Sequence, residues 1–85
     1  QANPDYSDGF YLLGNAYFSD KQYAKALDAY RRSLDLRPNF TRARYNAALS
    51  YIRLNNKSGA LEQYNALLNI DKDLAGRLKA EIDAN

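Results

Sequence analysis

The chain has 85 residues, of which 46% are apolar and 26% charged, and its formal net charge at pH 7 is +2. This balance is typical of a small globular domain, and the charge gives no indication of a nucleic-acid partner. The sequence contains no Cys and no His. It therefore lacks disulfides, thiolate zinc ligands, and both the commonest metal ligand and the commonest general base. We expect no metal, no cofactor and no catalytic site.

No apolar run approaches the roughly 20 residues that span a bilayer, and no basic-then-apolar leader opens the chain. We expect a soluble protein without membrane insertion and favour the cytoplasm, although no residue identifies a compartment. Because the chain opens at Gln1 rather than Met, we expect an excised piece or a processed product.

The sequence repeats with a period of 34 residues. A shift by this length aligns identical pairs, namely Pro4 with Pro38, Tyr11 with Tyr45, Tyr17 with Tyr51, Ala26 with Ala60, Leu27 with Leu61, Tyr30 with Tyr64 and Leu34 with Leu68. A period of this length with two helical halves is typical of a stacked helical array, in which each unit packs on its neighbours.

Apolar residues at three- and four-residue spacing predict five helices, at about 7–19, 23–36, 41–54, 58–70 and 74–84. Pro38 ends the second helix, because proline disfavours helical geometry in the residue before it. Asn39 or Thr41 is predicted to cap the third helix, and Asp73 the fifth. The fifth helix has one narrow apolar stripe, which suits the end of a stack.

The turns inside the two helix pairs differ in sequence. Asn55 tolerates the left-handed backbone conformation that such turns often require. Lys21, at the equivalent position, does so less readily, which predicts either mild strain or a slightly different turn.

These residues resemble the tetratricopeptide repeat. Its pattern has a large apolar residue, Leu, a small residue and an aromatic on the first helix, then small, aromatic, small and proline on the second. The first unit supplies Phe10, Leu13, Gly14, Tyr17, Ala26, Tyr30, Ser33 and Pro38. The second supplies Ala47, Ala48, Tyr51, Ala60 and Tyr64, and departs with Arg44, Leu67 and Lys72. The resemblance implies an all-α fold, a right-handed α-α superhelix of two helical hairpins and a capping helix.

We expect one domain over residues 1–85, divided into the tail of a preceding repeat (1–6), repeat 1 (7–40), repeat 2 (41–74) and a capping helix (74–84). Because the boundary at Pro4 mirrors that at Pro38 and the last helix lacks the core residues of a third unit, we expect the C-terminal end of a longer array.

Small residues are predicted to let the paired helices approach closely, with Gly14 facing Ala26 and Ala48 facing Ala60. Bulky rings would fill the wedges between successive helices, with their hydroxyl groups reaching polar partners or water; these are Tyr17, Tyr30, Tyr51 and Tyr64.

In the family that the sequence resembles, the first helix of each hairpin lines a concave face. By position, that face would carry Asp8, Tyr11, Asn15, Phe18, Ser19, Arg42, Tyr45, Leu49, Ile52 and Arg53. We predict a peptide-binding site formed by Tyr11, Asn15, Phe18, Arg42, Tyr45, Asn46, Leu49 and Arg53. The two tyrosines would anchor a protein or peptide ligand, the two asparagines would hold its backbone, and the two arginines would meet its carboxylates.

Other interpretations stay open. Phe18, Leu49 and Ile52 could instead pack against neighbouring helices. The segment could be a structural end-piece of a scaffold whose binding site lies upstream. It could also self-associate through the apolar end near Tyr6, Phe10 and Tyr23.

Two narrower hypotheses concern the ligand. Chaperone-binding members of the family capture a C-terminal carboxylate with Asn and basic residues; Asn15 and Asn46 match that pattern, whereas Tyr11, Gly76 and Ala80 do not. Residues 42–51 are also similar to peroxisomal targeting-signal receptors. Single-strand nucleic acid is disfavoured, because acidic residues are interspersed among the arginines.

Overall fold

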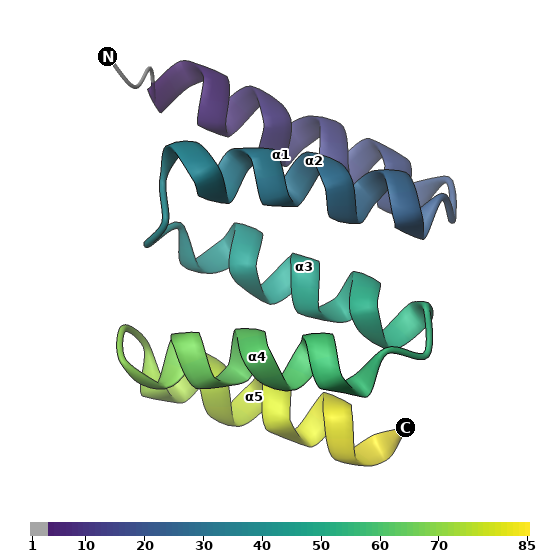
Figure 1. Cartoon of the computed structure of the whole chain (residues 1–85), viewed down its shortest axis with the longest axis vertical. Coiled ribbons are helices and arrows are strands. Elements are labelled where there is room, and N and C mark those ends of the chain that lie inside the picture. Colours follow the sequence, from purple (N-terminus) through teal and green to yellow (C-terminus); the bar gives the residue numbers. More distant parts are fainter. Residues whose placement is uncertain (1–3) are drawn as a thin grey trace.

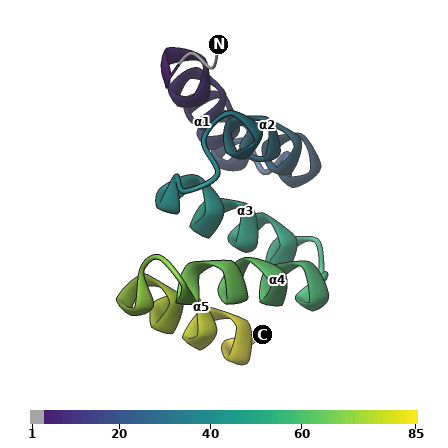
Figure 2. The same cartoon turned by 60° about the vertical axis from the view of Figure 1, so that its left-hand side comes forward.

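The structure, a computed structural model, describes the backbone of residues 4–85 and the side chains of residues 6–85. In that range the chain forms five α-helices and no strand, and successive helices run antiparallel to each other (Figure 1). The helices are α1 (Pro4–Ser19), α2 (Tyr23–Leu36), α3 (Thr41–Arg53), α4 (Lys57–Leu68) and α5 (Lys72–Ala84). The all-α prediction is confirmed, and α1 and α5 lie at opposite ends of the stack (Figure 2).

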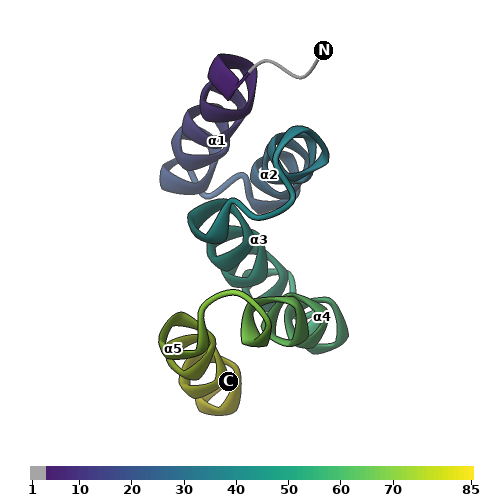
Figure 3. The ribbon, with the colours of Figure 1, turned by 90° about the vertical axis from the view of Figure 1, so that its left-hand side faces the viewer.

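The helices form two layers. Viewed along the helix pairs, α1, α3 and α5 lie on one side and α2 and α4 on the other (Figure 3). In the first layer α1 lies close to α3 and α3 close to α5, whereas in the described part of the chain no Cα atom of α2 lies within 8 Å of one of α4. The layer whose helices lie closer together is the inner side of a curved stack, so α1, α3 and α5 face the concave side.

Helix boundaries agree with the predictions to within a few residues, with three differences. Helix α1 begins at Pro4 rather than near residue 7. Its first residue is therefore a proline, whose fixed φ suits the first helical position. Helix α3 follows Phe40, without a side-chain cap, so neither Asn39 nor Thr41 fulfils the predicted role. Helix α5 is capped by Asp71, whose side chain accepts a hydrogen bond from the Leu74 N–H at 3.0 Å, and not by Asp73.

The two turns inside the hairpins have the same geometry. Lys21 has φ of 61° and Asn55 has φ of 62°, both left-handed. The Gln22 N–H donates to the Tyr17 carbonyl at 2.9 Å, and the Asn56 N–H donates to the Tyr51 carbonyl at 2.8 Å, which is the Schellman arrangement in both cases. The alternative of a different turn at Lys21 is thus wrong. The other expectation, mild backbone strain from the left-handed φ of Lys21, remains.

Lys21→Asn is expected to raise the free energy of unfolding by about 0.5–1 kcal/mol, because Asn adopts the left-handed conformation more readily than Lys. The thermal midpoint should rise by roughly 2–8 °C. Asn55→Lys, the matched control, should lower it by a similar amount. Two substitutions with the same sign of effect would contradict this account of the turns.

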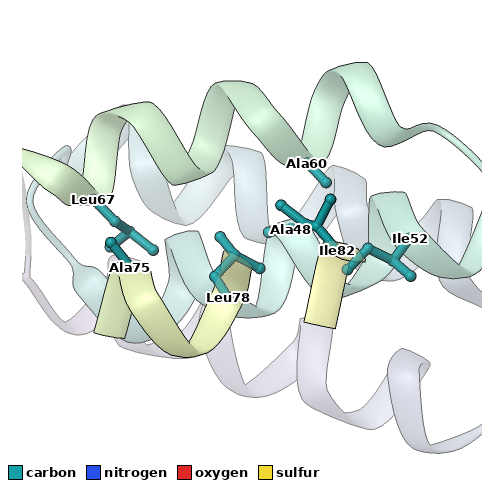
Figure 4. Close-up of a cluster of buried hydrophobic side chains, with 7 residues drawn as sticks. All are labelled: Ala48, Ile52, Ala60, Leu67, Ala75, Leu78 and Ile82. Atoms are coloured by element: carbon teal, nitrogen blue, oxygen red, sulfur yellow. The ribbon is translucent and has the colours of Figure 1, made fainter. Parts of the chain in front are cut away.

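One hydrophobic cluster joins the last three helices (Figure 4). Its fully or nearly buried members are Ala48, Ile52, Ala60, Leu67, Ala75, Leu78 and Ile82. Ala60 of α4 points toward Ala48 of α3, as the sequence predicts, and Leu78 of α5 lies in the middle of the group (Figure 4). A second cluster, built on Tyr30, Ala26 and Ala47, joins α1, α2 and α3.

Two glycines accommodate tyrosine rings. A Cβ atom at Gly14 would lie within 3 Å of the Tyr30 ring, and one at Gly59 would lie equally close to the Tyr51 ring. Gly14 therefore leaves room for the Tyr30 ring, and the predicted approach of Gly14 to Ala26 stays a prediction. Of the four predicted wedge residues Tyr30 is fully buried, and the others are half-buried.

Candidate functional site

The inner layer contains a hollow of about 170 Å³ that both hairpins line, and we refer to it as the groove hollow. Its lining residues are Asn15, Phe18, Ser19, Tyr30, Asn46 and Leu49. The α1 residues are spaced by three and four positions, and the α3 residues by three, so each helix turns one face into the same space. Four of the eight predicted site residues thus lie together here.

A polar network forms one wall of the groove hollow. The Tyr30 hydroxyl donates to the Asn15 Oδ1 atom at 2.5 Å, and the Asn46 Nδ2 atom donates to the same oxygen at 3.0 Å. Burial raises the pKa of Tyr30 to about 12, with the Asn46 amide opposing the shift and Tyr11 adding to it. The hydroxyl is therefore protonated at neutral pH and acts as a donor.

The rest of the hollow and its surroundings are apolar and cationic. Phe18 is half-buried, with its ring in edge contact with Tyr23 at a centroid separation of 5.0 Å. The guanidinium group of Arg53 lies over the same Phe18 ring, 5.8 Å from its centroid. Arg53 and Arg42 are both exposed. The apolar side chains of Phe18 and Leu49, with guanidinium groups nearby, suit a ligand that combines an apolar side chain with a carboxylate.

The rings of the two predicted anchor tyrosines, Tyr11 and Tyr45, mostly contact other residues of the chain. Tyr11 is half-buried and packs on Phe40 at a centroid distance of 4.8 Å and on Tyr30 at 6.1 Å. Tyr45 packs against the cluster of Figure 4. Burial raises the pKa of Tyr45, and Glu81 adds to this effect while Arg77 opposes it. Neither tyrosine lines the groove hollow, so each offers a ligand only the exposed part of its ring.

Two further residues expected on the concave face have other surroundings. Ile52 is only 5% exposed and belongs to the core, so for this residue the packing interpretation is correct. Asp8 is exposed and forms an ion pair with Arg37 at 2.9 Å. Tyr30 was predicted to fill a wedge with its hydroxyl reaching a polar partner or water, and that partner is Asn15; the 34-residue pairing with Tyr64 gives no signal that the hydroxyl reaches the groove.

A second apolar surface lies at the α1 end of the stack. Tyr6 and Leu13 are 64% and 44% exposed. Two hollows of about 420 and 390 Å³ share Phe10 and Leu13 in their walls, and Lys25, Asp28 and Arg32 line the larger one. Tyr23, which was also predicted there, is half-buried and packs on Phe18.

Residues 4–85 contain no helix long and apolar enough to cross a membrane. The same residues contain no group of three or more acidic side chains that could hold a metal ion.

Two family patterns, both described as the tetratricopeptide repeat, match residues 7–40 and 42–73. The chain belongs to the tetratricopeptide repeat family. The matched ranges start close to the repeat boundaries expected from the 34-residue period, and each covers one helical hairpin. A tetratricopeptide hairpin pair of this kind is a protein-interaction scaffold.

A curated relative is the UDP-N-acetylglucosamine–peptide N-acetylglucosaminyltransferase of Giardia intestinalis, which is 30% identical over 70 residues. The match covers 82% of this tetratricopeptide chain but only 5% of the relative. The match therefore concerns only a small part of the relative.

Proposed function

We propose that this chain is a non-catalytic protein-interaction module that binds a peptide or a helix along the concave groove of its tetratricopeptide repeats. The observation that carries the proposal is the groove hollow, where Asn15 and Asn46 from successive hairpins meet beside the apolar side chains of Phe18 and Leu49. The other predicted site residues, Tyr11, Arg42, Tyr45 and Arg53, extend this surface.

Polar groups in the hollow match the peptide backbone. Among residues 6–85 the Asn15 Nδ2 and Asn46 Oδ1 atoms have no hydrogen-bond partner. Neither atom is fully buried, so a ligand can reach both. One donor and one acceptor are therefore available beside the apolar side chains of Phe18 and Leu49. A peptide supplies the complementary pair in every residue, together with a side chain that fills the pocket.

Charge near the groove favours an acidic ligand. Arg42 and Arg53 are exposed at the two ends of α3, and neither has an ion-pair partner among the described residues. Each can therefore reach a ligand carboxylate without first breaking an internal pair. The ligand that fits best carries an apolar anchor flanked by acidic residues.

The test is selection of short peptides on the immobilised chain from a random display library, followed by affinity measurement with two groove variants. Arg53→Glu reverses one charge at the groove, and Ser19→Tyr fills the hollow from an exposed position at the end of α1. Each is expected to weaken the enriched peptides at least about tenfold, which corresponds to about 1.4 kcal/mol.

Arg31→Glu is the matched control, because it makes the same charge change on an exposed residue of α2, outside the groove. It should leave affinity within about twofold, since a distant surface charge acts only through screened electrostatics. Equal affinity of the enriched peptides for the parent chain and for both groove variants would refute the groove as the binding site.

A second candidate, self-association, is favoured by the apolar surface at the α1 end. Tyr6 and Leu13 are exposed there, and the surrounding Lys25 and Asp28 could pair with each other across a two-fold axis. Sedimentation at several concentrations decides this candidate, because a monomer throughout would exclude it, while Leu13→Glu should abolish any dimer.

A further inference from the structure

The amide groups in the groove hollow have a defined orientation. Asn15 Oδ1 receives two hydrogen bonds, from the Tyr30 hydroxyl and from the Asn46 Nδ2 atom. An amide oxygen has two lone pairs, so both are used. The Asn15 nitrogen and the Asn46 oxygen are left for the groove.

The opposite orientation, with both amides turned over, is disfavoured by Tyr30. It would place the Asn15 nitrogen, which is only a donor, against the Tyr30 oxygen. The hydroxyl hydrogen would then have to turn to the Asn46 side chain, which is near enough to lower the pKa of Tyr30 but makes no contact with the hydroxyl as close as the 2.5 Å bond to Asn15. Tyr30 is only 1% exposed, so its hydroxyl depends mainly on protein acceptors, and a buried donor with a poorer partner is costly.

Tyr30 cannot adjust to that change by moving. Its ring lies against Gly14, where an added Cβ atom would come within 3 Å, and it packs beside Tyr11. The raised pKa of Tyr30 keeps its hydroxyl protonated. The position and the donor character of the hydroxyl are thus both determined by the core.

We propose that Tyr30 is a positioning residue, whose buried hydroxyl orients the Asn15 and Asn46 amides so that the groove presents a donor on α1 and an acceptor on α3. One consequence of this inference, the direction of a bound peptide, rests on the proposed function. The order of donor and acceptor along the groove determines that direction. In an extended peptide the N–H and C=O of one residue point to the same side. The N–H meets Asn46 and the C=O meets Asn15, so the peptide runs from its amino end at α3 to its carboxyl end at α1.

The orientation can be tested without a ligand. Asn15→Asp keeps an oxygen facing both donors, whereas Asn46→Asp replaces a donor by an oxygen that faces the Asn15 oxygen. Both variants add one negative charge at nearly the same place, so each is the control for the other. At neutral pH, the thermal midpoint of Asn46→Asp is expected to lie at least about 5 °C below that of Asn15→Asp. An equal or reversed order would overturn the proposed orientation.

The role of Tyr30 is tested by repeating the pair in the Tyr30→Phe background, which keeps the ring in contact with Gly14 but removes the hydroxyl. The amides are then free to turn over, and the difference between the two Asp variants should shrink to about 2 °C or less. A tyrosine that only filled space would leave this difference unchanged, and that result would refute the positioning role.

The direction is read from a peptide enriched in the display selection that carries a nitroxide label at one end. A label at the carboxyl end should broaden the backbone amide signals of α1 more than those of α3, and a label at the amino end should do the reverse. The opposite pattern would overturn the inferred direction. If no peptide is enriched, the proposed function fails, while the melting comparison still decides the orientation of the amides.

Discussion

Leu78→Ala is expected to lower the free energy of unfolding by about 2–5 kcal/mol, the range for deletion of a large aliphatic side chain from a core. Leu78 is 0% exposed and packs among residues from α3, α4 and α5 (Figure 4). Its loss leaves a cavity between three helices, which cannot all move inward together. Because natural domains are stable by only about 5–15 kcal/mol, this change removes a large share of the total.

Urea unfolding followed by far-UV circular dichroism measures the effect. Leu12→Ala is the control, since it deletes the same atoms from a residue of α1 that is 63% exposed. It should change the free energy of unfolding by less than about 0.5 kcal/mol. If Leu12→Ala destabilised the chain as much as Leu78→Ala, the assignment of α5 to the core would be wrong.

Gly14→Ala is expected to destabilise the fold by about 3 kcal/mol, although Ala is the better helix former. The added Cβ atom would come within 3 Å of the Tyr30 ring, which is fully buried and cannot rotate away. Overpacking costs up to about 3 kcal/mol. Displacement of the ring also breaks the bond to Asn15, which costs about 1 kcal/mol, while the helix gains about 1 kcal/mol from Ala.

Gly76→Ala makes the same chemical change in α5, where an added Cβ atom would meet nothing within 4 Å. The helix-propensity gain then acts alone, and we expect stabilisation by about 0.5–1 kcal/mol. The two substitutions should therefore shift the urea midpoint in opposite directions. A rise of the urea midpoint for Gly14→Ala as well would show that the Tyr30 ring is not held against Gly14.

Periodicity predicted the helices well because each one carries an apolar stripe that its neighbours bury. Tyr23–Leu36 was predicted with both ends correct, since Pro38 marks its end and a polar break its start. Capping was harder to predict: Asp71 and Asp73 are both good caps near the same helix, and only the backbone shows that Asp71 accepts from Leu74. The sequence also did not reveal that Lys21 has the same φ as Asn55. The neighbouring backbone hydrogen bonds impose this conformation whichever side chain is present.

The groove was predicted less completely. Positions on α1 and α3 located Asn15, Phe18, Asn46 and Leu49 in one hollow, because helical spacing determines which residues share a face. The same spacing could not show that Tyr11 would be covered by Phe40, which comes from the connection between the hairpins. The spacing also could not show a contact from the second layer, such as that of Tyr30 with Asn15. That contact depends on the position of α2 along the axis of α1.

The wide separation of the α2 and α4 backbones has a mechanical consequence. A stack of helices that lie close together on one side only bends most easily in the direction that opens or closes the other side. Small changes in curvature spread or close α2 and α4 with little loss of packing, and they alter the distance between α1 and α3 in the same movement. A ligand that bridges α1 and α3 would restrict bending of the whole stack. Its binding would therefore affect any partner that is bound at the other end of the stack.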